Sequence, residues 1–145
     1  MRNIVFIFVP AACALAFITF YAHPGLFLAF PLQRPVPWAL FMLLYPLLAA
    51  YPQEIIFRSW FFHRYTVVFE SPRVIVAVSA LSFGMAHLFY GNWIAPAIAA
   101  AGGIIFGYRY LTTGSLPAVA LEHGLWGDFL FSIGMGWFLY SGQIQ

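Results

Sequence analysis

Three apolar stretches of the sequence each carry polar side chains at positions that lipid would surround. The first holds Gln53, Glu54 and Arg58, and two later stretches hold His87 and His123. Ionisable groups at membrane depth are costly and usually mark a functional site. At about 1.5 Å per helical residue, Glu54, His87 and His123 all fall within a hydrocarbon core of about 30 Å. The pattern predicts one polar site where the three stretches meet.

The residue types restrict the chemistry that such a site can perform. No H-E-x-x-H zinc motif occurs, and the inverted H-x-x-E-H pattern fails because Val119 stands where its first histidine would be. Asp128 is the only aspartate, which excludes an aspartate pair, and no serine lies in a G-x-S-x-G turn. Cys13 has no neighbouring histidine in the sequence. A carboxylate and an imidazole acting on water remain, which is general acid–base hydrolysis without a metal or other cofactor.

The same residues also allow structural interpretations. Glu54 and Arg58 are four residues apart, with the acid first, which favours an internal salt bridge that hides two charges. Each histidine is also explained by a hydrogen bond between helices. The alternative to an enzyme is a non-enzymatic membrane protein, either a proton-coupled carrier subunit or a binder of hydrophobic peptides.

Composition places these side chains in a membrane. The 145 residues are 63% hydrophobic and 7% charged, with no lysine, whereas a soluble domain is about 25% charged. The net charge of +2 is too small and scattered for nucleic-acid binding. The sequence predicts an all-α, polytopic transmembrane helix bundle that forms a single domain over residues 1–145 and is surrounded by membrane lipid.

Breaks in the apolar pattern divide the chain into about five expected spans. Turn residues follow the first span, and Ser71-Pro72 is typical of a helix start. The first span has a cleaved signal peptide as its alternative, because Arg2 precedes it. The expected spans are 4–22, 38–62, 74–90, 93–110 and 116–140.

Five spans would put the two ends of the chain on opposite sides of the membrane. Four arginines fall on the N-terminal side and one falls on the other, namely Arg2, Arg64, Arg73 and Arg109 against Arg34. The positive-inside rule then predicts a cytoplasmic N-terminus.

Prolines and small residues indicate how the expected spans bend and pack. Pro46 and Pro52 each remove a backbone donor, and Pro52 should loosen the helix just before Glu54. A small residue recurs every four positions in the fourth span, which is typical of close packing between helices. These residues are Ala95, Ala99, Gly103 and Gly107.

The ordered motifs resemble a known family. Gln53-Glu54-x-x-x-Arg58, Phe83-x-x-x-His87 and a helix beginning at His123 are similar to the CAAX-protease and bacteriocin-processing family of glutamic intramembrane endopeptidases. The resemblance covers about residues 51–140, as a protease-like core. The runs Y-P-Q-E-I-I-F-R and L-E-H-G-L-W-G-D are most similar to its small exosortase-like, myxosortase-type branch, which is thought to process C-terminal sorting signals.

The resemblance implies roles for individual residues. Glu54 and His87 would activate water, His123 would help to stabilise the oxyanion, and Arg58 would hold the acidic motif in place. Gln53 stands where the family usually has the first of two glutamates, which is the one usually assigned as the base. The implied substrate is a protein or peptide with a hydrophobic or lipidated tail.

The region after His123 departs from the family pattern. The family has Asn or Asp four residues after its last histidine, but Gly127 is there and Asp128 is five residues away. Five residues rotate about 140° past a full helical turn, so Asp128 joins the catalytic set only if a π-bulge turns it toward His123. Gly124 and Gly127 allow such a distortion, and the alternative is an interhelical hydrogen bond.

Two further polar residues lie beside the predicted site. Glu122 is expected to pack near an arginine or the membrane interface rather than to act in the site. Asn92 follows His87 in a tight turn, where it either orients the site or caps the turn.

Overall fold

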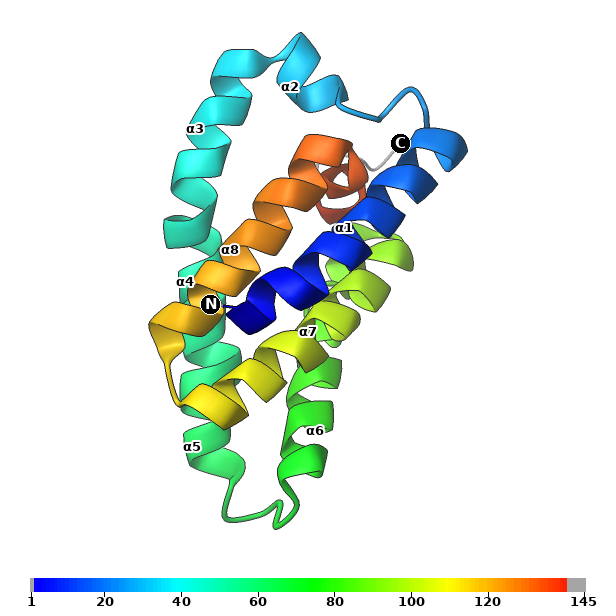
Figure 1. Cartoon of the computed structure of the whole chain (residues 1–145). Helices are drawn as coiled ribbons and strands as arrows, with labels where there is room; N and C mark the ends of the chain where they lie inside the picture. Colours follow the sequence, from blue (N-terminus) through cyan, green and yellow to red (C-terminus); the bar gives the residue numbers. More distant parts are fainter. Residues whose placement is uncertain (1, 141–145) are drawn as a thin grey trace.

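The chain is a bundle of helices in the computed structural model, which describes residues 2–140 and side chains from Ile4 onward (Figure 1). No strand occurs within residues 2–140, so the predicted all-α class is confirmed. In chain order the elements are α1 (Arg2–Ala22), α2 (Ala29–Gln33), α3 (Pro35–Tyr45), η1 (Pro46–Ala50), α4 (Tyr51–Glu54), η2 (Ile55–Trp60), α5 (Phe61–Tyr65), α6 (Pro72–Met85), η3 (Leu88–Tyr90), α7 (Ile94–Thr113), α8 (Leu116–Ile133) and η4 (Met135–Leu139).

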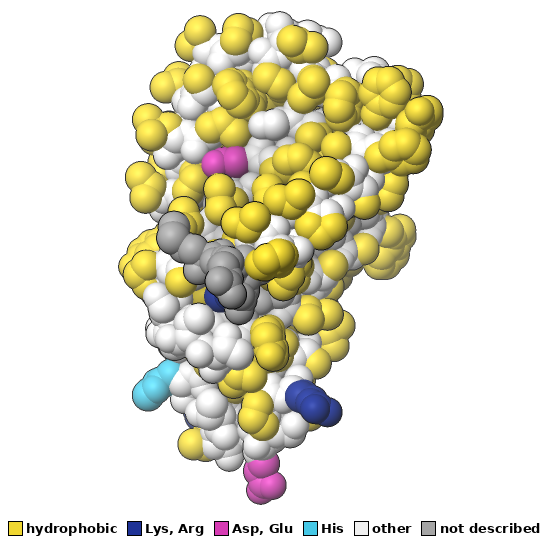
Figure 2. Space-filling view, in the orientation of Figure 1, with side chains coloured by type: hydrophobic (Ala, Val, Ile, Leu, Met, Phe, Trp, Pro, Cys, Tyr) yellow, Lys and Arg dark blue, Asp and Glu magenta, His cyan; other side chains and the backbone are white. Residues whose placement is uncertain are grey.

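Four helical stretches of the described chain are long and apolar enough to cross a membrane. They are Ile4–Ala22, Pro35–Tyr65, Pro72–Tyr90 and Ile94–Thr113. Many large apolar side chains are exposed on the bundle, and Figure 2 shows them spread over most of one face. Lipid is the solvent that suits such a surface, because a water-soluble protein rarely exposes so large an apolar area. The expected polytopic membrane architecture is confirmed.

The expected fifth span, 116–140, differs from the observed structure. Helix α8 ends at Ile133, because Gly134 takes a left-handed conformation with φ 98° and the 3₁₀ segment η4 follows. Any side chain at Gly134 would collide with the carbonyl of Leu26. Helix α8 is also not among the four apolar candidates, because Glu122, His123 and Asp128 lower its hydropathy. It lies at the centre of the bundle, against α1, α3, α4, η1 and α7.

The second membrane helix is continuous from Pro35 to Tyr65 but contains two π-helical segments, η1 and η2. Pro46 opens η1, as expected where a backbone donor is missing. Pro52 lies within the short α-helical segment α4, so the wider turns fall on either side of it. These two segments set the direction in which α4 presents Glu54, and π-helical turns are frequent at functional sites.

Helices α6 and α7 pack against each other most closely, along the predicted ridge of small residues. A Cβ atom at Gly103 would lie 2.8 Å from the Cα of Ala80, and one at Gly107 would lie 3.2 Å from a methyl group of Val76. Ala95 and Ala99 on the same ridge are buried. The ridge therefore brings the two backbones together, as expected for membrane helices.

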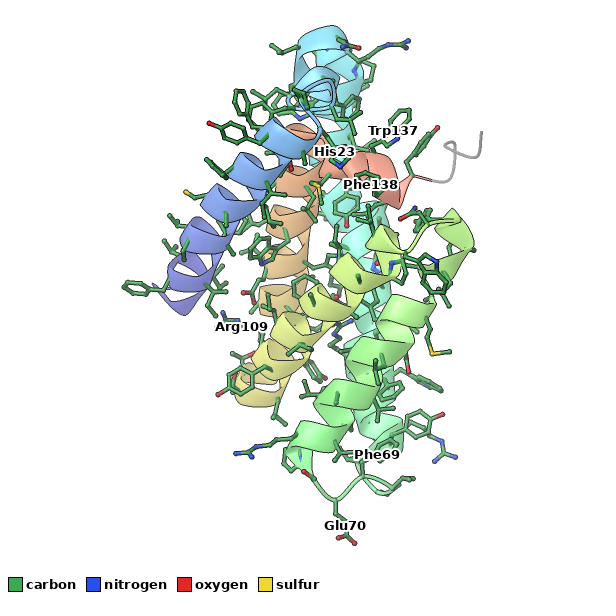
Figure 3. The ribbon with its side chains drawn as sticks, turned by 90° about the vertical axis from the view of Figure 1, so that its right-hand side faces the viewer. His23, Phe69, Glu70, Arg109, Trp137 and Phe138 are labelled. Carbon is green, nitrogen blue, oxygen red and sulfur yellow. The ribbon has the colours of Figure 1, made fainter. Side chains whose placement is uncertain are left out.

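The two ends of the bundle carry different groups. Figure 3 places Phe69 and Glu70 in the loop between α5 and α6, and His23, Trp137 and Phe138 at the opposite end. There, the rings of His23 and Phe138 have centroids 5.5 Å apart, which joins the end of α1 to η4. The central part of the bundle, between these ends, holds the candidate site.

Candidate active site

Glu54 is a fully buried carboxylate with a different partner on each oxygen. Its Oε2 atom lies 3.0 Å from Nε of Arg58, and both side chains are 0% exposed. Its Oε1 atom accepts a hydrogen bond of 2.7 Å from Nδ1 of His123. The expected Glu54–Arg58 pair is present, and the same carboxylate also reaches α8. A salt bridge that only hides two charges would not hold an imidazole as well.

Arg58 joins the second membrane helix to α7. Its Nη2 atom donates to the backbone carbonyl of Gly103 over 3.1 Å. Its guanidinium carbon lies 4.8 Å from the ring centre of Phe83 and 5.4 Å from that of Phe106. Contacts between cations and aromatic faces stabilise a charge that is withheld from water. The guanidinium is therefore fixed, and it holds Glu54 in place.

His123 is held in one orientation by two aromatic rings and two hydrogen bonds. Phe106 stacks on its imidazole at 4.6 Å between centroids, and Phe83 meets it edge-on at 5.5 Å. Because an ionised carboxylate only accepts hydrogen bonds, the contact with Glu54 places a hydrogen on Nδ1. The other ring nitrogen, Nε2, lies 3.2 Å from the hydroxyl oxygen of Tyr45.

His87 lies just beyond the end of α6, and its ring contacts Phe83, which also contacts His123. Its Nδ1 atom is 2.8 Å from the backbone carbonyl of Phe83, and the two rings are 4.7 Å apart. Because a carbonyl only accepts, this contact also places the hydrogen of the neutral ring on Nδ1. Nε2 of His87 then carries a lone pair that is available to a bound water.

A cavity of about 400 Å³ brings the two histidines together. His87, His123 and Tyr45 supply ionisable side chains to its wall, which is otherwise mostly apolar. Residues of α1 and α7, among them Leu15 and Phe106, complete it. Glu54 does not line this cavity, so its carboxylate reaches the cavity only through His123.

Asp128 does not join this group in the way the sequence suggested. Helix α8 is α-helical from Leu116 to Ile133 without a π-bulge, so five residues still rotate the side chain away from His123. Asp128 does not line the cavity, and its Oδ1 atom is buried without a hydrogen-bond partner among residues 2–140. The π-helical segments lie in the second membrane helix instead.

The glycines of α8 serve a different purpose from the one expected of them. A Cβ atom at Gly124 would lie 2.9 Å from Cβ of Pro46, and one at Gly127 would overlap the ring of Tyr45. The two glycines therefore allow the second membrane helix to approach α8 closely, and α8 itself stays α-helical. Tyr45 is a site residue that the sequence analysis missed. The two glycines that follow His123 were the available signal, because they indicate a close neighbour.

The other two predicted site residues, Asn92 and Gln53, both lie outside the cavity lining. Asn92 accepts a hydrogen bond from the backbone N–H of Ala95 over 2.8 Å and donates to the carbonyl of Phe138 over 2.9 Å. It therefore caps the turn before α7 and ties it to η4. Gln53 is half-buried and outside the cavity, and its Oε1 atom has no hydrogen-bond partner in the described part of the chain.

A second buried ion pair lies apart from the cavity. Oε2 of Glu122 accepts a hydrogen bond of 2.7 Å from Nε of Arg109, and the glutamate is 0% exposed. The expected placement of Glu122 near an arginine is confirmed. The pair links α7 to α8. Like Glu54, Glu122 is a buried glutamate that is paired with an arginine.

A comparison with known protein families gives a match that covers this site. The family described as Rce1-like, type II CAAX prenyl endopeptidase Rce1-like, matches residues 35–130. That range includes Tyr45, Glu54, Arg58, His87 and His123. No curated protein and no solved structure matches the chain.

Proposed function

The chain belongs to the Rce1-like family of type II CAAX prenyl endopeptidases, and from this premise we propose that it is an intramembrane endopeptidase using a carboxylate and two imidazoles. One observation supports this assignment most strongly. A mostly apolar cavity inside a membrane bundle contains His87 and His123, and a buried carboxylate orients one of them. The family match, residues 35–130, overlaps most of the expected protease-like core of about residues 51–140.

His87 is the general base of the proposed reaction. The contact of its Nδ1 atom with the carbonyl of Phe83 leaves the Nε2 lone pair to accept a proton from water in the cavity. Imidazole suits this task, because its neutral ring accepts a proton on one nitrogen and can return that proton to the leaving group.

Glu54 acts through His123. The sequence-based role had this carboxylate activate water itself, but Glu54 is 0% exposed and His123 lies between it and the cavity. The carboxylate holds Nδ1–H of His123 and stabilises a positive charge on the imidazole. That charge in turn stabilises negative charge on the substrate carbonyl oxygen.

Hydrolysis then proceeds in two steps. Water gives one proton to Nε2 of His87 while its oxygen bonds to the carbonyl carbon, and the carbonyl π electrons move onto the oxygen near His123. In the second step the C=O bond re-forms and the C–N bond breaks. The leaving amine takes the proton from His87, which restores the neutral imidazole, and the products are a carboxylic acid and an amine.

The substrate we propose is a membrane-tethered protein or peptide with a hydrophobic or lipidated tail near the cleaved bond. The largely apolar walls of the cavity suit such a tail, and α1 and α7 form part of these walls. The description of the matched family names CAAX prenyl endopeptidases. The sequence resemblance to the exosortase-like branch favours C-terminal sorting signals as the particular substrates.

The test is cleavage of peptides by the purified full chain in lipid vesicles. The peptides should carry a prenyl group or a C-terminal apolar helix. We expect cleavage by the wild type, and His87→Ala should lower kcat on the order of 10²–10⁴-fold, as is usual for general acid–base groups. His63→Ala is the control, because His63 is an exposed histidine on α5. Binding of the tailed peptides without any cleavage would reject the enzyme in favour of a peptide-binding membrane protein.

A further inference from the structure

Tyr45 is placed in the cavity by specific packing. Its ring stacks on Phe41, with centroids 5.1 Å apart and planes at 19°, and it lies 5.7 Å from the ring of Phe131. Its hydroxyl oxygen is 3.2 Å from Nε2 of His123. The residue that follows, Pro46, opens the first π-helical segment, so Tyr45 lies at the point where the helix changes its winding.

Helix α8 is shaped to receive this tyrosine. A Cβ atom at Gly127 would overlap the ring and the hydroxyl group of Tyr45, and Gly124 leaves room for Pro46 in the same way. His123 lies immediately before Gly124, so the room left by the two glycines allows Tyr45 to reach the imidazole of His123. No side chain other than glycine at 127 permits this position of Tyr45.

The hydrogen bonds run in one line from the carboxylate to the cavity. Oε1 of Glu54 takes Nδ1–H of His123, and Nε2 of His123 meets the Tyr45 hydroxyl. When His123 is neutral, Nε2 only accepts, so the phenolic hydrogen points at the imidazole. When His123 carries a second proton, Nε2–H donates to the phenolic oxygen, and the phenolic hydrogen turns toward the cavity.

We propose that the Tyr45 hydroxyl is the catalytic donor through which the Glu54–His123 pair acts on the substrate carbonyl oxygen. This inference rests on the proposed endopeptidase function and names a residue that the function alone does not require. Tyr45 lines the cavity, whereas Nε2 of His123 is already occupied by the tyrosine. A carbonyl oxygen in the cavity therefore meets the phenolic O–H.

The proposed donation involves no net transfer of a proton from Tyr45. As water attacks the carbonyl carbon, negative charge develops on the carbonyl oxygen, and the phenolic O–H donates a hydrogen bond to it. Hydrogen bonds to an ionised acceptor are about twice as strong as neutral ones, so this contact strengthens in the transition state. When the C–N bond breaks, the oxygen returns to a neutral carbonyl and the contact weakens again.

The first test compares wild type with Tyr45→Phe in the vesicle cleavage assay. Phenylalanine keeps the ring against Phe41 and Gly127 and removes only the hydroxyl. We expect kcat to fall on the order of 10²–10³-fold, as for the loss of one oxyanion donor, with little change in KM. Tyr110→Phe is the control, because Tyr110 packs against Phe62 and lies outside the cavity lining. A Tyr45→Phe rate close to wild type would overturn the proposal.

A second measurement does not depend on activity. In protein labelled with ¹⁵N-histidine, Tyr45→Phe should shift the Nε2 resonance of His123 and leave that of His63 unchanged. An unchanged His123 resonance would overturn the proposal, because it would show that the hydrogen bond is absent. If the shift occurs but the wild type cleaves no tailed peptide, the endopeptidase assignment fails together with the catalytic role of Tyr45, while the hydrogen bond stands. If the wild type cleaves and only the Tyr45 tests fail, the endopeptidase assignment stands.

Discussion

Glu54 shows how one buried carboxylate can serve two neighbours. Its pairing with Arg58 offsets the cost of removing its charge from water, and its hydrogen bond to His123 orients the imidazole. Arg58 is in turn fixed by the carbonyl of Gly103 and by two aromatic rings. Each charge therefore has a defined partner, which a buried ionic site requires.

The two buried glutamates give a matched test of the role of Glu54. Glu54→Gln keeps the shape of the side chain but removes the negative charge that stabilises a protonated His123. We expect kcat to fall on the order of 10²–10⁴-fold while the protein still inserts and binds substrate. Glu122→Gln also removes a buried charge beside an arginine, but at a pair that lies outside the cavity. It should lower thermal stability and leave kcat per folded molecule near wild type.

Activity and thermal unfolding should both be measured for the two variants at matched membrane levels. Wild-type kcat in Glu54→Gln would remove this carboxylate from the mechanism. Equal losses of kcat in both variants would mean that the effect of Glu54→Gln comes from destabilisation rather than from chemistry.

At the scale of elements, the contact between α6 and α7 supports the site from outside. The two backbones approach closely at Gly103, and the carbonyl of the same residue holds Arg58. The packing of the helices and the position of the guanidinium are therefore coupled. A change in the spacing of α6 and α7 should therefore move Arg58 and, through it, the carboxylate of Glu54, although neither helix carries Glu54.

Gly103→Ala tests this coupling. The added Cβ would lie 2.8 Å from the backbone of Ala80, so the helices must separate. Overpacking of this kind costs about 1–3 kcal/mol, and we expect a lower midpoint of thermal unfolding in detergent together with reduced cleavage. Gly25→Ala is the control, because a Cβ there meets nothing within 4 Å. An unfolding midpoint equal to that of the control would show that the contact tolerates a side chain.

The whole bundle has charged groups near its two ends. Arg64 and Arg73 lie on either side of the loop between α5 and α6, and Arg34 lies between α2 and α3, toward the other end. The positive-inside rule predicts that the loop that follows α5 faces the cytoplasm. The orientation of the N-terminus remains a prediction, and it depends on whether α8 crosses the membrane.

Reporter fusions at Met1 and Gln145, both outside the described residues, test this topology. We expect the Met1 fusion to report the cytoplasm and the Gln145 fusion to report the opposite side, because α8 extends through the centre of the bundle. A third fusion in the loop that holds Glu70 should report the cytoplasm. Both ends on the same side would mean that α8 does not complete a crossing.

Features that depend on local pattern followed from the sequence alone. The apolar composition determined a membrane bundle, because few charges remain to face water. The four-residue spacing determined the Glu54–Arg58 pair, and a small residue at every fourth position determined the close face of α7, because a helix brings such positions to one side. The family resemblance also rested on motifs that lie within single helices.

Only the tertiary structure decided which side chains meet across helices. The contact of Glu54 with His123 and the approach of Tyr45 depend on how η1 and η2 rotate the second membrane helix against α8. Pro46 and Pro52 predict a disturbed helix, but local pattern does not specify how far the wider turns rotate it. The predicted role of Asp128 depended in the same way on the local winding of a helix, here α8. The sequence allowed a π-bulge in α8, whereas the helix is α-helical from Leu116 to Ile133 and its glycines make room for Pro46 and Tyr45.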